Sequence, residues 1–180
     1  MTFMHRSSLA LLLGAALAVA GPASAQMIAP NPYADAGQWG ELPEGREWGA
    51  VSAIYPSPDG QTIWVAERCA ANTCANSDLD PILQFDLDGN LLQSFGSGEV
   101  LWPHGMFVEP DGSVWVADAA YIGAPTAEGR GHVMLKYSPE GDLLMTIGTI
   151  GEMGDGQYTF NRPSDILVAP DGSIFVADGH

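Results

Sequence analysis

The sequence predicts an all-β protein, a β-propeller built from four-stranded sheets, and three copies of one phrase are the main reason. Each copy is a Pro-Asp-Gly turn followed by a β-rich run that ends in an acidic residue. The copies begin at Pro58, Pro110 and Pro170, so they lie 52 and 60 residues apart. Internal periods of this length are typical of repeat architectures, in which one small structural unit recurs.

A second pair of strands recurs with the same 52-residue offset. Residues 83–95 align with 135–147, and each segment contains a glycine turn of the kind that closes a tight hairpin. One complete unit is therefore expected to have four short strands, near 105–109, 113–118, 132–137 and 142–147. The additional residues of the longer offset fall within the glycine-rich segment 148–163, which predicts an elongated loop.

The second strand of each unit is apolar throughout, as in Val114 to Ala117, rather than alternating. A strand has this pattern when both of its faces are covered, as they are in sheets stacked around the axis of a propeller. A β-sandwich would show more alternation and no fixed period, so it ranks second. We expect about two and a half blades, at 49–97, 98–148 and 149–180, the last incomplete. Closed propellers have 4–8 blades, so the chain is expected to be the N-terminal piece of a longer protein.

The first 25 residues predict a secretory signal peptide. An apolar run from Leu9 to Gly21 precedes the small residues Ala23-Ser24-Ala25, and the run is too short for a bilayer span. We expect cleavage after Ala25, a lead-in segment at 26–48, and a secreted or periplasmic protein without a membrane span. A retained N-terminal anchor is the alternative.

Charge and cysteine content restrict the function further. The formal net charge is −16, which repels polyanions and argues against a nucleic-acid partner. The only cysteines are Cys69 and Cys74, and in an exported chain they predict a disulfide. A metal site is the alternative for this pair, but no other cysteine and no nearby histidine would complete it.

Antiparallel strands bring separate parts of the sequence to one end of the blades. The starts of first strands and the ends of second strands share this end, together with the loop near 121–131, whereas the Pro-Asp-Gly turns lie at the opposite end. The residues expected to meet there are His104, Arg68, Asp118, Asp165 and His180. A mouth lined by histidine, arginine and carboxylates is a reasonable site for a small-molecule or peptide ligand.

Two of these residues carry open alternatives. His104 occupies a position that Ser164 fills in the next repeat, so the scaffold itself does not require histidine; a structural hydrogen bond is the alternative to a ligand role. Arg68 could clamp a carboxylate or a carbonyl, or could form a salt bridge with Asp78 or Asp80.

Other polar residues have mainly structural interpretations. Asp118 and Asp178 recur with the repeat, which favours a role in tying the loop that follows each of them. His132 is expected to pack near the same end. Residues 86–90 superficially resemble a calcium loop but lack its closing glutamate, so a hairpin turn is favoured.

Two stretches resemble a known family. Leu101 to Val108 with Val114 to Asp118, and Phe160 to Val168 with Phe175 to Gly179, are similar to the NHL-repeat propellers related to peptidyl-α-hydroxyglycine α-amidating lyase. The resemblance covers 49–180 and implies a six-bladed propeller. It also implies a lyase that releases a peptide amide and glyoxylate, with a zinc ion held by three histidines and a structural calcium ion.

The resemblance assigns roles to five residues. His104 matches a zinc ligand, and Ile54 and Met106 match positions whose backbone carbonyls hold calcium. Arg68 matches the active-site arginine. His180 stands where animal enzymes have a tyrosine proposed as the base, which leaves that role in doubt.

The remaining zinc ligands would have to come from blades outside this chain. The resemblance therefore implies that the chain is inactive alone, since catalytic zinc needs three protein ligands. Two other functions stay open: a non-catalytic NHL-type module that binds a peptide, glycan or protein, and a calcium-dependent lactonase, for which no motif is found.

Overall fold

A computed structural model describes residues 31–35, 37–120 and 129–179 of the chain. The chain divides into a short N-terminal unit, Met1–Asp35, and a main unit, Ala36–His180. The expected signal peptide, its cleavage site and His180 lie outside the described residues. In the described parts of the chain, no helix has the length and apolar character that crossing a membrane requires.

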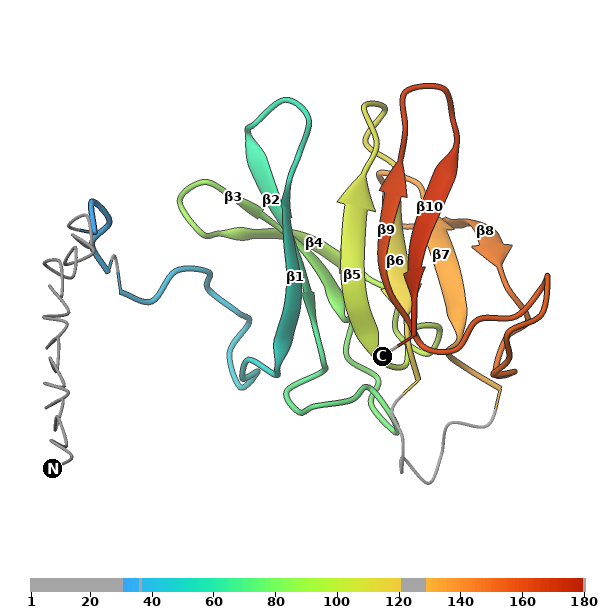
Figure 1. The fold of residues 1–180 in the computed structure, drawn as a ribbon. Helices are drawn as coiled ribbons and strands as arrows, with labels where there is room; N and C mark the ends of the chain where they lie inside the picture. Colours follow the sequence, from blue (N-terminus) through green and yellow to red (C-terminus); the bar gives the residue numbers. More distant parts are fainter. Residues whose placement is uncertain (1–30, 36, 121–128, 180) are drawn as a thin grey trace, which may run out of the picture. The chain divides into compact units, whose positions relative to one another are not determined.

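The main unit is all-β and is built from antiparallel sheets whose strands follow one another in sequence order (Figure 1). Two sheets have four strands, β1-β2-β3-β4 and β5-β6-β7-β8, and β9 pairs with β10. The strands are β1 Val51–Pro56, β2 Thr62–Glu67, β3 Ile82–Asp86, β4 Leu91–Phe95, β5 Pro103–Val108, β6 Val114–Asp118, β7 Val133–Tyr137, β8 Leu143–Ile147, β9 Pro163–Val168 and β10 Ile174–Asp178. The predicted all-β fold of consecutive four-stranded propeller blades is confirmed.

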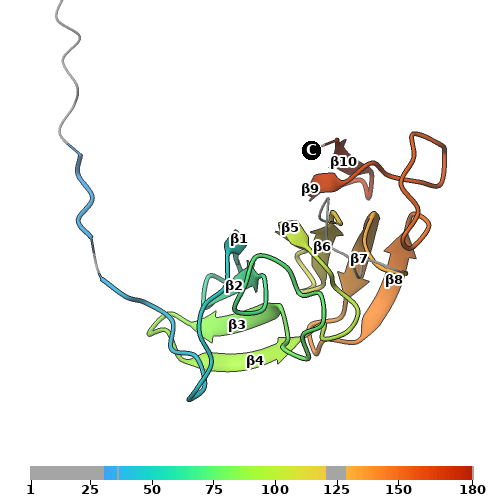
Figure 2. The ribbon, with the colours of Figure 1, turned by 90° about the horizontal axis from the view of Figure 1, so that it is seen from below.

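The first strands of the three sheets lie closest together within this unit. Strand β1 packs against β5, and β5 packs against β9, while β4 and β8 lie at the far edges of their sheets (Figure 2). Stacking of this kind covers both faces of the middle sheet, and all five residues of β6 are buried. In β10, by contrast, Phe175 is 61% exposed.

Local hydrogen bonds explain why the repeated turns form. The Oδ1 atoms of Asp59, Asp111 and Asp171 each accept a bond of 2.9 Å from the backbone N–H two residues ahead. The glycine that follows each aspartate has a positive φ, between 67° and 88°, which other residues adopt only with strain. The Pro-Asp-Gly turns are therefore structural hairpins.

The turn between β3 and β4 is stabilised in the same way. Asp86 accepts bonds of 2.8 Å from both the backbone N–H and the side-chain amide of Asn90, and Gly89 has a φ of 90°. The carboxylate of Asp86 therefore closes a hairpin turn. The sequence also favoured a turn over a calcium loop at residues 86–90.

The main core lies between the first two sheets and is rich in aromatic rings. Trp64 packs on Phe95 with ring centroids 5.6 Å apart, and Phe95 packs on Tyr137 at 5.0 Å. Valines of β5 and β6 complete this cluster. Burial of these large apolar side chains fixes the distance between neighbouring blades.

The acidic residue that ends each second strand holds the backbone that leads into the first strand of the same sheet. Glu67 accepts from Gly49 at 2.9 Å, Asp118 from Trp102 at 2.6 Å, and Asp178 from Asn161 at 2.8 Å. Antiparallel pairing explains these bonds, because it sets the end of a second strand beside the start of the first. Two of the acids also hold the loop that follows them, as predicted for Asp118: its carboxylate accepts from the backbone of Gly131, and Glu67 accepts from the backbone of Ala70 at 3.2 Å.

Candidate functional site

The Cys69–Cys74 disulfide closes a short loop directly after β2. The two Cα atoms are 5.0 Å apart and both residues are buried. The predicted disulfide is confirmed, and the alternative of a metal site at this pair is wrong. Because Arg68 immediately precedes this loop, the loop helps to determine where its side chain lies.

Arg68 is held against the second sheet rather than in an ion pair. Its Nε donates to the Pro103 carbonyl at 3.1 Å and its Nη1 donates to Asn72 Oδ1 at 2.6 Å. The guanidinium lies 3.8 Å from the centre of the Trp102 ring, a cation–π contact. Burial lowers the pKa of Arg68, but an arginine side chain stays charged in proteins.

The suggested salt bridge from Arg68 to Asp78 or Asp80 is not formed. Neither of the two ion pairs among the described residues involves Arg68. Asp80 instead accepts bonds from Ser94 and from the backbone of Ser97.

Trp102 lies between Arg68 and His104. Its indole N–H donates to the Asn72 carbonyl at 2.8 Å, and its ring meets the His104 imidazole edge to face, with centroids 5.5 Å apart. The structure thus brings Arg68 and His104 to one end of the blades through a shared tryptophan. Asn72 supports both Arg68 and Trp102, and sequence reasoning missed it.

His104 is oriented by the neighbouring sheet. Its Nδ1 is 2.9 Å from the carbonyl oxygen of Ser164. A carbonyl only accepts, so Nδ1 carries the proton and the lone pair of the neutral ring is on Nε2. Metal-binding histidines are commonly fixed in this way, with one ring nitrogen donating to a carbonyl.

Gly105 permits this close approach of the two sheets. A Cβ atom at this position would lie 2.5 Å from both the Ser164 carbonyl oxygen and Asp165 Oδ1. Real Cβ atoms do not tolerate such distances, so the residue next to His104 must lack a side chain. Asp165 also accepts a bond from the backbone of Ile166 at 2.9 Å.

The described residues do not contain a complete zinc site. No group of three or more histidine, cysteine, aspartate or glutamate residues that could hold a metal occurs within 31–35, 37–120 and 129–179. A catalytic zinc needs three protein ligands and an open position, so His104 fits as a single ligand. His180, the suggested base, lies outside the described residues.

The two residues expected to hold calcium lie on neighbouring strands. Ile54 is in the middle of β1 and is 65% exposed, whereas Met106 is in β5 and is buried. Because β1 packs against β5, both backbones belong to the region where the first strands meet.

Asp118 holds the backbone of the segment that carries Trp102. It is fully buried, and this burial raises its pKa to about 6, although the N–H bonds from Trp102 and Leu101 favour the charged form. Asp118 therefore holds the backbone of Trp102, which in turn lies between Arg68 and His104.

His132 has a packing role. Its Nδ1 accepts a bond from the backbone of Arg162 at 3.2 Å, and burial lowers its pKa. Both residues have positive φ, so they form a connection between the second and third sheets.

Comparison with known proteins gives two kinds of relative. No family model matches the chain. NHL repeat-containing protein 3 of Mus musculus is 30% identical over 136 residues, which cover 73% of this chain and 35% of that protein. A probable peptidyl-alpha-hydroxyglycine alpha-amidating lyase of Caenorhabditis elegans is 26% identical over 149 residues, covering 75% of this chain and 40% of the relative.

A third relative matches over a shorter segment but at higher sequence identity. Peptidylglycine alpha-amidating monooxygenase of Rattus norvegicus is 35% identical over 106 residues, covering 56% of this chain and 10% of that protein. The chain therefore spans less than half the length of each of these relatives. The resemblance to NHL-repeat proteins and to amidating lyases is confirmed.

Proposed function

We propose that this chain, whose sheets are propeller blades of the NHL type, is part of an exported, metal-dependent lyase-like propeller. Its substrate would be a peptidyl-α-hydroxyglycine or a related carbinolamide. The observation that carries the proposal is the placement of Arg68 and His104 on either side of Trp102. The similarity to amidating lyases supports it, and the disulfide is typical of an exported protein.

Arg68 would bind the carboxylate of the substrate. Its Nε and Nη1 are bonded to the protein, and Nη2 makes no hydrogen bond within the described residues. The guanidinium is therefore fixed in direction while it retains a charged donor for the ligand. Charge-assisted bonds to a carboxylate are among the strongest hydrogen bonds available, and partial burial strengthens them.

The reaction would split the carbinolamide without adding or removing atoms. The hydroxyl proton leaves, the C–O bond becomes the carbonyl of glyoxylate, the C–N bond breaks, and the amide nitrogen receives a proton. His180 is our candidate for the base, because an imidazole exchanges protons near neutral pH.

His104 would contribute one zinc ligand through Nε2, and the backbone carbonyls of Ile54 and Met106 would hold a structural calcium ion. Zinc, when bound, would polarise the hydroxyl of the substrate. The other zinc ligands would come from further blades of a completed propeller.

Glyoxylate release by such a completed propeller tests the proposal. We expect His104→Ala to abolish release, and Arg68→Ala to raise KM more than Arg68→Lys does. His132→Asn is the matched control, because asparagine keeps an acceptor and tolerates the left-handed backbone. Full activity of His104→Ala would overturn the mechanism.

A second function is favoured by the match to NHL repeat-containing protein 3, which extends over 136 residues. On this proposal the propeller is a binding module that recognises a peptide, a glycan or a protein at the same end. Metal analysis separates the two: a completed propeller that contains no zinc and releases no glyoxylate would support the module.

A further inference from the structure

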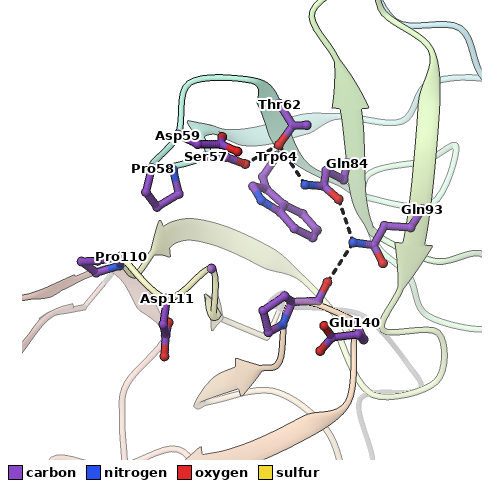
Figure 3. A pocket seen from close by; sticks show the side chains of 12 residues that line it. Ser57, Pro58, Asp59, Thr62, Trp64, Gln84, Gln93, Pro110, Asp111 and Glu140 are labelled. Carbon is purple, nitrogen blue, oxygen red and sulfur yellow. Dashed lines mark hydrogen bonds between the residues drawn. The ribbon is translucent and has the colours of Figure 1, made fainter.

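A groove of about 480 Å³ lies between the first two sheets, at the end that carries the Pro-Asp-Gly turns (Figure 3). Strand β2 begins at this groove with Thr62 and ends at Glu67, next to Arg68. Six extended residues span roughly 20 Å, so the groove is separate from the proposed site.

A relay of neutral polar side chains crosses the groove. Ser57 Oγ and Thr62 Oγ1 are hydrogen bonded, and Gln84 Nε2 donates to Thr62 Oγ1 at 2.8 Å. Gln93 Nε2 donates to Gln84 Oε1 at 2.7 Å and to the carbonyl of Pro139 in the second sheet at 2.8 Å. The second N–H of Gln84 and the Oε1 of Gln93 are outside this relay, within the part of the chain described.

Trp64 provides an indole donor at the groove. The residue is only 2% exposed and lines the groove, yet no acceptor among the described residues bonds to its Nε1. In Figure 3 its indole lies between Ser57 and Gln84, with the nitrogen on the side of Pro58 and Pro110. The Nε1 atom is not among the fully buried unpaired polar atoms of the described residues, so it is open to the groove and can donate to a ligand there.

The equivalent tryptophan in the second sheet is satisfied. Trp115 Nε1 donates to Glu109 Oε1 at 2.6 Å, and Lys136 forms an ion pair of 2.6 Å with the same oxygen. Trp115 pairs with Lys136 across β6 and β7, just as Trp64 pairs with Gln84 across β2 and β3.

The first sheet therefore has a neutral pair where the second has an ion pair. Ser57 follows β1 at the position where Glu109 follows β5, and Gln84 replaces Lys136. Serine is too short to replace the glutamate as acceptor, and the groove is open beside Trp64.

Charge identifies the class of ligand. Three exposed carboxylates line the groove, and no lysine or arginine does so; the carboxylates are those of Asp59, Asp111 and Glu140. Anions are therefore repelled, and a cation is attracted. Proline rings of both sheets also line the groove and suit an aliphatic side-chain stem.

We propose that this groove binds a basic peptide segment. A main-chain carbonyl of the peptide accepts from Trp64 Nε1, and a main-chain N–H donates to Gln93 Oε1. The lysine or arginine side chain of the peptide pairs with the carboxylates at the rim. The proposal is independent of the lyase function, because it concerns residues at the opposite end of the strands.

The indole N–H signal of Trp64 in a ¹⁵N-labelled sample reports on binding directly. Trp64→Phe assigns this signal among the five tryptophans. Addition of acetyl-Gly-Arg-Gly-amide should shift it in a saturable way, and more strongly at low salt, whereas acetyl-Gly-Glu-Gly-amide should not. An unmoved signal, or an equal response to the acidic peptide or to maltotriose, would overturn the proposal.

A transplant from the second sheet is the sharpest variant. Ser57→Glu combined with Gln84→Lys recreates the pair of Glu109 and Lys136 around Trp64, and should weaken binding of the arginine peptide at least tenfold. Full affinity in this variant would overturn the proposal.

Three further variants give milder tests. Gln93→Met copies Met145 of the second sheet and removes the Oε1 acceptor, so it should weaken binding. It serves as the test where the transplant variant does not fold. Asp59→Asn with Glu140→Gln should weaken binding several-fold and reduce its salt dependence, whereas Asp171→Asn, in the third turn, should not change it. Equal losses from Asp171→Asn and the rim variant would contradict the assigned location.

Discussion

The first two sheets share strand order and turn geometry, yet they hold the acid at the end of the second strand in different ways. Glu67 has a charged partner, since Arg46 Nη2 lies 2.6 Å from its Oε1 and both side chains are buried. Asp118 accepts only N–H groups in the hydrogen bonds among described residues, and burial raises its pKa to about 6. One position in the repeat can therefore be stabilised by an ion pair or by backbone donors.

The same contrast recurs at the other end of the strands. There the second sheet has an ion pair beside its tryptophan, and the first sheet has neutral amides. The ion pairs of the two sheets thus lie at opposite ends. The backbone repeat is maintained. The side chains at either end of the strands determine whether the polar groups there are paired within the protein or can bind a ligand.

Removing the acid of the first sheet should have the largest effect. Glu67→Ala leaves Arg46 buried without its partner, and breaking a buried ion pair costs about 3–5 kcal/mol of unfolding free energy. Urea unfolding measures this loss, with Glu47→Ala as the control, since Glu47 is exposed and forms no ion pair among the described residues. Equal losses of unfolding free energy from the two changes would mean that the ion pair does not stabilise the fold.

The acid of the second sheet should make stability depend on pH. The pKa of Asp118 is raised on folding, so between about pH 4 and 6 the folded state binds more protons than the unfolded state. The unfolding free energy should therefore fall as pH rises through this window, by about 3 kcal/mol for this group. Asp118→Asn should remove this part of the slope in urea titrations; an unchanged slope would show that another group titrates.

Reducing the disulfide should have an intermediate effect on stability. Opening a loop this short should cost about 2 kcal/mol. The loop also holds Trp102 through Asn72, so the fluorescence of Trp102 should change on reduction. A Cys69→Ser, Cys74→Ser variant should match the reduced protein, and a Trp102→Phe variant should lack the fluorescence change.

The two equivalent tryptophans should differ by the smallest amount. Trp115→Phe loses the bond to Glu109, whereas Trp64→Phe loses no hydrogen bond within the described residues. Thermal or urea unfolding should show Trp115→Phe to be the more destabilising change by about 1 kcal/mol. The opposite order would argue that Trp64 already has a partner at its Nε1.

The periodic features could be predicted from the sequence. The strands and the Pro-Asp-Gly hairpins follow from turn chemistry and antiparallel pairing, which act over a few residues or repeat at a fixed spacing. The Cys69–Cys74 disulfide followed from the pairing of the only two cysteines.

The individual side-chain partners could not be predicted. Asn72 bonds to a side chain four residues away and to one 30 residues away, and nothing in its neighbourhood marks it. Glu67 finds Arg46 in a lead-in segment that lies outside the repeat. The salt bridge suggested for Arg68 was wrong because stacking on Trp102 and two neutral acceptors hold the guanidinium. Such choices depend on three-dimensional proximity, which periodicity does not encode.

Gly105 has a consequence for how this protein can change. The Ser164 carbonyl reaches the imidazole of His104 only because a hydrogen atom occupies the place of a Cβ at the next residue. Even the Cβ of alanine would lie 2.5 Å from the Ser164 carbonyl oxygen and would force the two sheets apart there. The histidine can therefore be exchanged with little disturbance of the scaffold, whereas the neighbouring glycine leaves protein engineers no tolerated replacement.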